Sequence, residues 1–248
     1  MAGATSTTLR EAARGVRDVW AVGLGLIPLG VAFGLLVVQM GFAWWWAPIF
    51  SIIIYAGSME YLALGLVTGG ASWVTAAVTG LLVNFRHVFY GLTYPRHRIR
   101  RRWARAYATY AITDEVYAVT ARFGADGLDD DGLPVSSMRL LTITAVAQAL
   151  WVSSGILGAL GGSLADIPWA GLEFALTALF VVLALDAFLS SRDLSLPVIA
   201  LGCGLFAAVV APGHLLIVAL SAYFGIHVLR FLSPRFDAWL TTPLGGGR

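Results

Sequence analysis

The sequence predicts an all-α polytopic membrane protein with seven to eight hydrophobic helices, one or two of them broken or re-entrant. Of the 248 residues, 58% are hydrophobic and only 12% are charged, whereas soluble domains carry about 25% charged residues. The mean hydropathy is +0.80. Several apolar runs are long enough to cross the ~30 Å hydrocarbon layer of a bilayer. Residues 1–248 are therefore expected to form a single transmembrane domain, with no soluble domain beside it.

The chain begins with a polar stretch, and its first apolar segment covers residues 19–40. Arg10, Arg14 and Arg17 recur at helical spacing, which predicts an amphipathic lead-in on the membrane surface. The apolar segment contains Pro28 among several glycines. Because proline removes one ladder hydrogen bond, a kinked or broken helix is expected. A packing face of small residues is the alternative interpretation of the glycines.

The second and third apolar segments carry polar groups at depth. Residues 44–68 begin with three tryptophans, as an interfacial aromatic belt does, and contain Glu60. Residues 71–94 carry Asn84, Arg86 and His87 near their middle. An arginine at the centre of a span costs ~2.5 to 3.5 kcal/mol to insert, so Arg86 is expected to face protein or a wet cavity and to have a counter-charge. Snorkelling of Arg86 to a headgroup is the alternative.

A basic loop follows, with six arginines within residues 96–105. The positive-inside rule places loop 95–105 in the cytoplasm. The same rule accounts for the charge of the loop, so no nucleic-acid partner is expected.

The fourth segment, residues 104–121, is shorter and contains Asp114 and Glu115. The acidic loop 126–131 lacks the ligand alternation of an EF-hand and is expected to be a solvated external loop. The remaining apolar segments are residues 138–161, 168–189, 196–210 and 213–231, and the last two are joined around Pro212. Glu173 and Asp186 lie in segment 168–189. The single cysteine, Cys203, excludes an intrachain disulfide, and no cofactor or metal is expected.

The basic residues give conflicting topology signals. Residues 10–17, the basic loop and the C-terminal tail all favour the cytoplasm, but three full crossings before the loop put the N-terminus and the loop on opposite sides. Either the N-terminal signal is overridden, or one segment in each half is re-entrant, which is allowed only where the backbone is buried or lines a cavity. The first segment and the segments around Pro212 are the candidates.

Depth counting identifies a partner for Arg86. Arg86 precedes Arg96 by ten residues and Asp114 follows Arg105 by nine, so on antiparallel helices both lie ~14 to 15 Å from the basic loop. We expect Arg86 and Asp114 to pair, with Glu60 as a second acid lining the same cavity. Glu115 points ~100° away around its helix. An ion pair that merely fixes helix packing is the alternative interpretation.

A cluster with both signs of charge suits a zwitterionic substrate. Arg86 and the Asn84 amide are expected to hold a carboxylate, and Glu60 or Asp114 an ammonium group. His87 and Glu115 are the candidates for proton coupling, since imidazole and desolvated carboxylates carry protons readily. Together these predictions describe residues 1–248 as one transmembrane transporter domain.

A family resemblance adds to this interpretation. It rests on four motifs in order: Ile27-Pro28-Leu29-Gly30-Val31-Ala32-Phe33-Gly34, Tyr55-Ala56-Gly57-Ser58-Met59-Glu60-Tyr61, Val83-Asn84-Phe85-Arg86-His87-Val88-Phe89-Tyr90-Gly91 and Thr113-Asp114-Glu115. Together they resemble the AzlC family, the large subunit of bacterial branched-chain amino acid exporters. The resemblance covers residues 10–232, and it departs at Glu60, where many members carry Gln.

The resemblance implies a secondary active exporter in the bacterial cytoplasmic (inner) membrane. Its substrates would be valine, leucine, isoleucine and sometimes methionine, and transport would be driven by the proton-motive force. It also implies a partner, a small membrane subunit of the AzlD type.

Two other functions compete with this one. Ser153 and Ser154, with His214 or His227, suggest an intramembrane serine hydrolase, but the Gly-x-Ser context that exposes such a nucleophile is missing. A passive channel, or an accessory membrane subunit that stabilises a partner, is the other alternative.

Overall fold

The computed structural model describes residues 2–123, 128–129, 132–164, 181, 185 and 193–241. The predicted segment 168–189, with Glu173 and Asp186, lies almost wholly outside them. Regular structure in the described residues consists of helices. Three of these are long and apolar enough to cross a membrane, Thr8–Gln39, Ser137–Leu164 and Pro212–Leu232, and two shorter apolar helices are Trp73–Asn84 and Ser195–Val210. The membrane class is confirmed, and the count of seven to eight helices stays a prediction.

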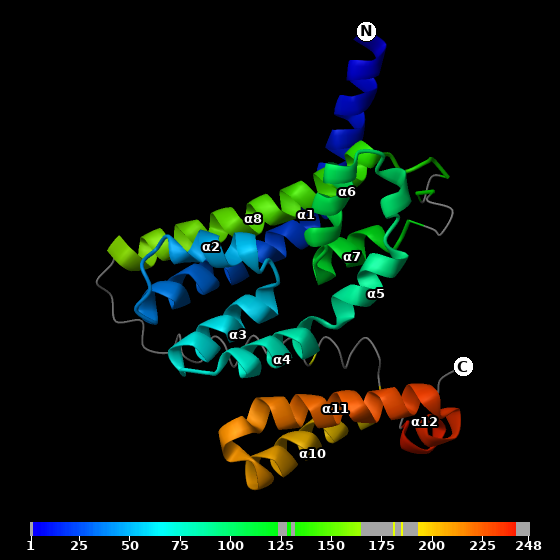
Figure 1. The fold of residues 1–248 in the computed structure, drawn as a ribbon. Coiled ribbons are helices and arrows are strands. Elements are labelled where there is room, and N and C mark those ends of the chain that lie inside the picture. The colour runs from blue at the N-terminus through cyan, green and yellow to red at the C-terminus, as the bar shows by residue number, and fades with distance from the viewer. Residues whose placement is uncertain are drawn as a thin grey trace. The chain divides into compact units, whose positions relative to one another are not determined.

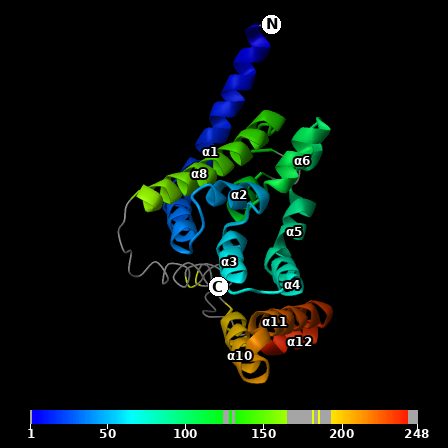
Figure 2. The same cartoon turned by 60° about the vertical axis from the view of Figure 1, so that its left-hand side comes forward.

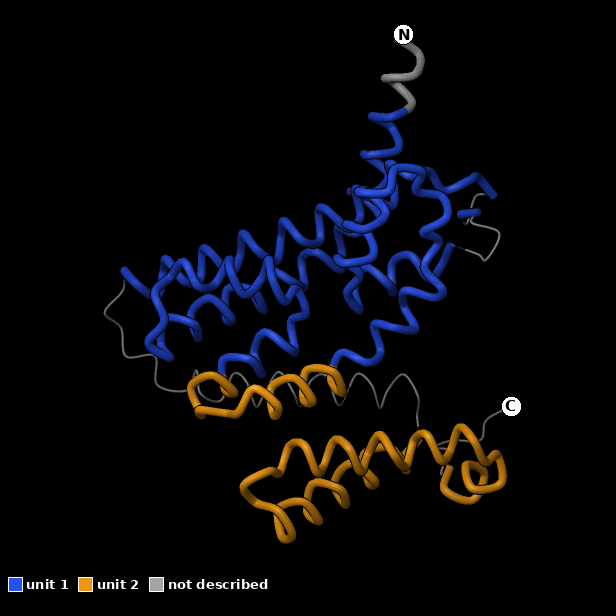
Figure 3. The backbone as a smooth tube through the Cα atoms, in the orientation of Figure 1, with its two compact units in different colours: residues 1–64, 84–170 blue, residues 65–83, 171–248 orange. Residues whose placement is uncertain are grey.

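The chain forms two compact units (Figure 3). Unit 1 comprises Met1–Leu64 and Asn84–Ala170, and unit 2 comprises Gly65–Val83 and Gly171–Arg248. All the residues predicted for the site belong to unit 1.

Unit 1 is organised around two long helices, α1 (Ala2–Gln39) and α8 (Ser137–Leu164), which pack against each other (Figure 1 and Figure 2). Gly15 lies against Arg139, and Gly34 lies against Gly155, so the residue numbers rise together and the helices run parallel. A Cβ atom at Gly34 would stand 1.9 Å from the Gly155 carbonyl oxygen. Backbones this close require glycine, and the packing face predicted as the alternative for this segment is present.

The helix is not broken at Pro28, since α1 is continuous from residue 2 to residue 39. The alternative of a kink at this proline stays a prediction. Pro28 still removes one ladder hydrogen bond. Gly30 and Gly34 on either side of the next turn are packed against α8, and this interhelical contact holds the helix together across the proline.

The second apolar segment is a helical hairpin rather than one span. Helix α2 (Trp46–Ile53) begins beside Phe42, with the Phe42 and Trp46 ring centroids 5.9 Å apart, and runs back along α1 until Tyr55 lines a cavity with Leu26. Tyr55 has φ = 42°, in the left-handed region that a bulky residue rarely adopts. The chain reverses at this strained residue.

Helix α3 (Gly57–Thr68) leaves the reversal in the opposite direction. Gly57 lines the same cavity as Leu26, whereas the Tyr61 hydroxyl donates to the Leu29 carbonyl at 2.7 Å and the Tyr61 ring lies 5.4 Å from Phe33. The start of α3 thus returns along α1 toward the end from which α2 came, so α2 and the start of α3 form a hairpin.

The third apolar segment is interrupted at Phe85, between α4 (Trp73–Asn84) and α5 (Arg86–Thr93). The short helix η1 (Arg96–Arg98) then opens the basic loop. Within this loop the Arg105 guanidinium donates twice to the Ile99 carbonyl, at 3.0 and 2.9 Å.

The fourth apolar segment is a second hairpin, made of α6 (Arg102–Tyr110) and α7 (Asp114–Thr120). Before it, Arg98 donates to the Val135 carbonyl at 3.3 Å, and after it Arg122 pairs with Asp18 at 2.9 Å. Asp18 also pairs with Arg139, four residues after Val135, so the hairpin begins and ends at the same end of unit 1. Arg98, Arg122 and Arg139 define this as the basic end.

These two hairpins change the predicted topology. The chain reverses within residues 46–64 and 102–121, whereas the first segment that we expected to be re-entrant is one long helix, and the segments around Pro212 form the hairpin of unit 2 described below. How many segments cross the membrane stays a prediction. Because α1 starts at the basic end, the N-terminal arginines and the basic loop lie at the same end of unit 1. The charge conflict in the sequence is thereby removed.

Of the acidic loop 126–131 the structure describes residues 128 and 129, and Asp129 differs from expectation. Asp129 is not solvated: its side chain is 6% exposed, and its carboxylate lies 2.6 Å from Arg139 Nη1. Arg139 donates to Asp18 as well, at 2.5 and 3.1 Å, so both of its neighbours carry negative charge. This network ties the loop to α1 and α8 at the basic end.

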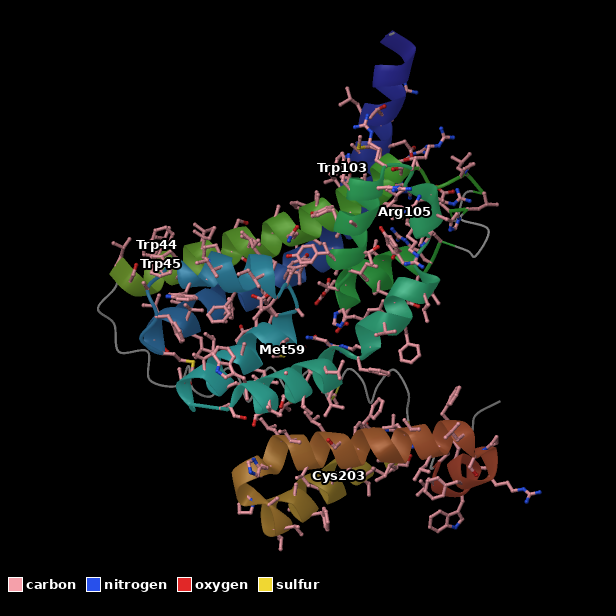
Figure 4. The ribbon with its side chains drawn as sticks, viewed as in Figure 1. Trp44, Trp45, Met59, Trp103, Arg105 and Cys203 are labelled. Carbon is pink, nitrogen blue, oxygen red and sulfur yellow. The ribbon has the colours of Figure 1, made fainter. Side chains whose placement is uncertain are left out.

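Aromatic residues mark both ends of unit 1. Figure 4 shows Trp44 and Trp45 at one end of α8 and Trp103 with Arg105 at the other. The three indoles are 42%, 45% and 67% exposed, as expected for side chains at two membrane interfaces.

Unit 2 contains a hairpin of α10 (Ser195–Val210) and α11 (Leu215–Leu232), joined by η2 (Pro212–His214), and ends in α12 (Pro234–Leu240). Buried Arg230 lies 2.9 Å from Asp193 and 2.6 Å from Asp237 and donates to Ser195 at 2.8 Å. The guanidinium therefore holds α10, α11 and α12 together at one end of this hairpin.

Candidate functional site

The reversal points of the two hairpins of unit 1 meet in the interior of the unit. A cavity of about 20 Å³ lies between them. It is lined by Leu26, Tyr55, Gly57, Thr113, Glu115 and Trp151. This volume suffices for about one water molecule. The tip of the second hairpin also contacts Gln148, whose Oε1 accepts a hydrogen bond of 2.7 Å from the Tyr107 hydroxyl. Gln148 lies ~16 Å along α8 from Ser137, in the interior of this long helix.

Arg86 and Asp114 form the predicted pair. Arg86 is the first residue of α5, and Asp114 is the first residue of α7, directly after the tip of the second hairpin. Arg86 Nη2 lies 2.7 Å from Asp114 Oδ2 and also donates to Ser58 Oγ of α3 at 3.3 Å. Both charged side chains are partly exposed, by 42% and 34%. The pair is therefore open on one side rather than sealed in a core.

Two of the residues predicted for the site, Asn84 and Asp114, each have an oxygen atom without a hydrogen-bond partner in the described part of the chain. Asn84 Oδ1 and Asp114 Oδ1 are both buried, and neither has a hydrogen-bond partner among the described residues. Leaving a buried acceptor unpaired costs about 1–3 kcal/mol. Asp114 Oδ1 belongs to the carboxylate that pairs with Arg86, and Asn84 precedes Arg86 by two residues in the chain.

An aromatic contact holds the pair in position. The rings of Tyr90 in α5 and Tyr117 in α7 are stacked, with centroids 4.3 Å apart. The stack fixes the two short helices against each other one turn away from Arg86 and Asp114. The helix that carries Arg86 and the helix that carries Asp114 are therefore held together by this aromatic contact.

Glu60 makes contacts different from those expected. It is fully buried, and its carboxylate accepts hydrogen bonds from Ser51 Oγ at 2.7 Å and from Trp151 Nε1 at 3.0 and 3.1 Å. The ion pairs of the described residues join Arg86 to Asp114 and leave Glu60 outside. Glu60 therefore connects α2, α3 and α8 at the reversal point of the first hairpin.

This geometry gives a prediction for Glu60. Glu60→Gln is expected to leave thermal stability in detergent nearly unchanged, because the amide oxygen still accepts from Trp151. Glu60→Leu leaves the indole N–H and the Ser51 hydroxyl unpaired, which costs about 1–3 kcal/mol and lowers the melting temperature of the purified protein. Equal melting temperatures for the two variants would show that these hydrogen bonds do not stabilise the hairpin.

The two residues predicted for proton coupling each follow a member of the pair in the chain, His87 after Arg86 and Glu115 after Asp114. His87 Nδ1 is 3.1 Å from the Asn84 carbonyl oxygen, and its ring packs edge-on against Tyr90. Glu115 lines the cavity together with Tyr55 and Trp151. Their roles in coupling stay predictions.

The serines considered for a hydrolase are bonded to their own helix. Ser153 Oγ donates to the Leu150 carbonyl at 3.3 Å, and Ser154 Oγ donates to the Trp151 carbonyl at 2.9 Å. Ser154 is 2% exposed and packs against Gly30 of α1. These are the contacts of helix-packing residues.

Sequence reasoning missed the partners that tertiary structure supplies. Trp151 and Ser51 hold Glu60, Ser58 contacts Arg86, and Tyr110 donates to the Ile52 carbonyl at the end of α2. One signal was available for Tyr55 and Ser58, since both flank Gly57 within the motif that carries Glu60.

Comparison with known proteins places the chain in a family. Residues 21–165 match the family described as AzlC protein. The branched-chain amino acid transport protein AzlC of Bacillus subtilis is 26% identical over 203 residues, which cover 82% of this chain and 78% of that protein. The inner membrane protein YgaZ of Escherichia coli is 33% identical over 188 residues, or 73% of this chain and 74% of that protein.

A membrane protein of Helicobacter pylori is 29% identical over 166 residues, which cover 66% of this chain and 70% of that protein. No solved structure matches the chain. The family match covers more than half of the sequence and includes the hairpins that position Glu60, Arg86 and Asp114. The chain therefore belongs to the AzlC family of membrane transport proteins.

Proposed function

We propose that the chain is the large subunit of a secondary active exporter for branched-chain or other apolar amino acids. In this proposal residues 1–248 form one transmembrane transporter domain in the bacterial inner membrane, with loop 95–105 in the cytoplasm. The observation that carries the proposal is the open Arg86–Asp114 pair, in which Asp114 directly follows the tip of the second hairpin and keeps one oxygen unpaired among the described residues. The name of the Bacillus subtilis relative supports the substrate class.

A zwitterion fits this site for electrostatic reasons. Its carboxylate takes the place of Asp114 at the Arg86 guanidinium, which binds carboxylates with a two-pronged geometry. Its ammonium group takes the place of Arg86 at Asp114 and donates to Asn84 Oδ1. Since each charge keeps an opposite charge, binding leaves no uncompensated ion in the membrane interior.

Interrupted helices at mid-bilayer support a transport role. In secondary transporters, substrate and ion sites lie near the midplane between discontinuous helices. Here two hairpins that enter from opposite ends of unit 1 meet beside Arg86, Asp114 and Glu115. We assign substrate binding to Arg86, Asn84, Asp114 and Glu60, with Glu60 acting through the hairpin that carries Ser58. We assign proton coupling to His87 and Glu115.

The partner in this proposal is the small membrane subunit of the AzlD type that the family resemblance implies. Much of the apolar surface of the hairpin in unit 2 is exposed, including Val198, Leu201 and Val209 at 64%, 64% and 84%. Lipid or a second subunit covers such residues in a membrane.

Counterflow in proteoliposomes tests the function. Radiolabelled leucine, valine and methionine are measured with the purified chain, with and without the small subunit. The exporter proposal expects counterflow of at least one of them, and uphill transport that a protonophore abolishes. Downhill flux that is insensitive to the protonophore would favour the passive channel. Transport by the small subunit alone would make this chain an accessory subunit.

A further inference from the structure

A large basic pocket lies at the basic end of unit 1, away from the Arg86 site. Its volume is about 770 Å³, and its basic lining consists of His97, Arg98, Arg100 and Arg101. None of the described residues that line the pocket carries a carboxylate. The positive charge of this concave surface is therefore not neutralised from within.

The pocket is a built feature rather than a loose loop. Arg98 Nη1 donates to the Val135 carbonyl at 3.3 Å, which fastens the basic loop to the segment before α8. Ile99 between these arginines is fully buried, and its carbonyl accepts two hydrogen bonds from Arg105. Arg100 and Arg101 are exposed, so their guanidinium groups are available to a ligand.

The opposite wall adds polar and apolar groups. Ser136 and Ser137 line the pocket where α8 begins, and Ser136 Oγ caps that helix by accepting from the Arg139 N–H at 3.1 Å. The positive end of the α8 dipole thus faces the same space as the arginines. Trp103 and Met138 also line the pocket and are 67% and 39% exposed. An indole and a thioether at a membrane interface are suited to contact acyl chains.

We propose that this pocket binds the headgroup of an anionic phospholipid such as phosphatidylglycerol. The phosphate diester lies between Arg100 and Arg101 near the start of α8, and the acyl chains run along Trp103 and Met138 into the bilayer. Basic pockets at the cytoplasmic ends of transmembrane helices recognise such headgroups. The site is independent of amino acid transport and holds whether or not the Arg86 site binds a zwitterion.

Native mass spectrometry of the full chain in detergent tests the proposal. The protein is titrated with phosphatidylglycerol and, separately, with phosphatidylcholine of the same acyl chains. We expect selective retention of phosphatidylglycerol. The double variant Arg100→Gln/Arg101→Gln is expected to weaken its apparent affinity roughly 10- to 30-fold.

The matched control is Arg96→Gln/Arg102→Gln, which removes the same charge from the same loop outside the pocket. We expect this variant to bind phosphatidylglycerol like the wild type. Equal losses in both double variants would overturn the proposal, because net charge alone would then explain binding. Equal binding of the two lipids by the wild type would also overturn it.

Two further arms keep the result interpretable. Inorganic phosphate and glycerol phosphate are added as competitors, and displacement of the lipid by either at equal concentration would assign the pocket to a soluble anion instead. If the Arg100/Arg101 variant does not elute as a monodisperse peak, the single variant Arg100→Gln replaces it. This single variant is expected to weaken binding about 5-fold, and unchanged binding would contradict the proposal.

Discussion

Arg86→Ala is expected to reduce amino acid counterflow by roughly 100-fold while the protein still accumulates in the membrane. The guanidinium is the group that holds the substrate carboxylate, and its removal leaves Asp114 without its ion-pair partner. Arg86→Lys keeps the charge but loses the two-pronged geometry, so transport falls by about 10-fold. Initial counterflow rates of radiolabelled leucine, normalised to protein, are the measurement.

Arg122→Ala is the matched control for this prediction. Arg122 is 40% exposed and paired with Asp18 at 2.9 Å, which is similar to Arg86 in exposure and pairing. Asp18 keeps Arg139 as a partner, so this variant is expected to transport normally.

A neutral double variant separates substrate binding from packing. In Arg86→Gln/Asp114→Asn the two side chains can still hydrogen-bond, and no charge is left unpaired. If the pair only fixes helix packing, this variant keeps its transport activity. We expect it to fold and to remain inactive, because it offers neither charge to a zwitterion.

Gly34→Ala is expected to lower the melting temperature of the purified protein strongly. The new methyl group would stand 1.9 Å from the Gly155 carbonyl oxygen and 2.6 Å from the Ala159 nitrogen, so the two parallel helices must separate. Overpacking of this kind costs about 1–3 kcal/mol. Thermal unfolding followed by fluorescence-detected size-exclusion chromatography measures the change.

Gly25→Ala in the same helix is the control. Nothing lies within 4 Å of a Cβ atom at this position. Since alanine has a higher helix propensity than glycine, this variant is expected to be as stable as the wild type or more stable. Equal destabilisation of both variants would mean that the contact between Gly34 and α8 does not hold unit 1 together.

Counting residues along the chain predicted the charged pair, because the depth of each member can be measured from the same basic loop. Arg86 and Asp114 stand at nearly equal numbers of residues from the basic loop, and helical rise converts sequence into depth. The prediction does not depend on long helices, and α4, α5, α6 and α7 are short. Arg86 and Asp114 pair because they lie at nearly the same distance from the basic loop, one before it and one after it.

The hairpins were less predictable, since hydropathy measures the length of an apolar run and not its direction. Residues 46–68 are mostly apolar, yet the chain reverses at Tyr55, which carries no breaker signal of its own. The contact between Glu60 and Trp151 joins residues 91 positions apart. At Pro28 the sequence predicted a kinked or broken helix, and the helix is not broken.

The parallel packing of α1 and α8 has a consequence for biosynthesis. Helix α8 begins about a hundred residues after α1 ends, so α1 leaves the ribosome long before its partner is synthesised. Until then its glycine face must be shielded by lipid or by the insertion machinery, since domains assemble N-terminal part first during translation. A nascent chain stalled before residue 137 lacks α8, against which α1 packs. It also lacks the Trp151 indole, whose N–H donates to Glu60 of the first hairpin.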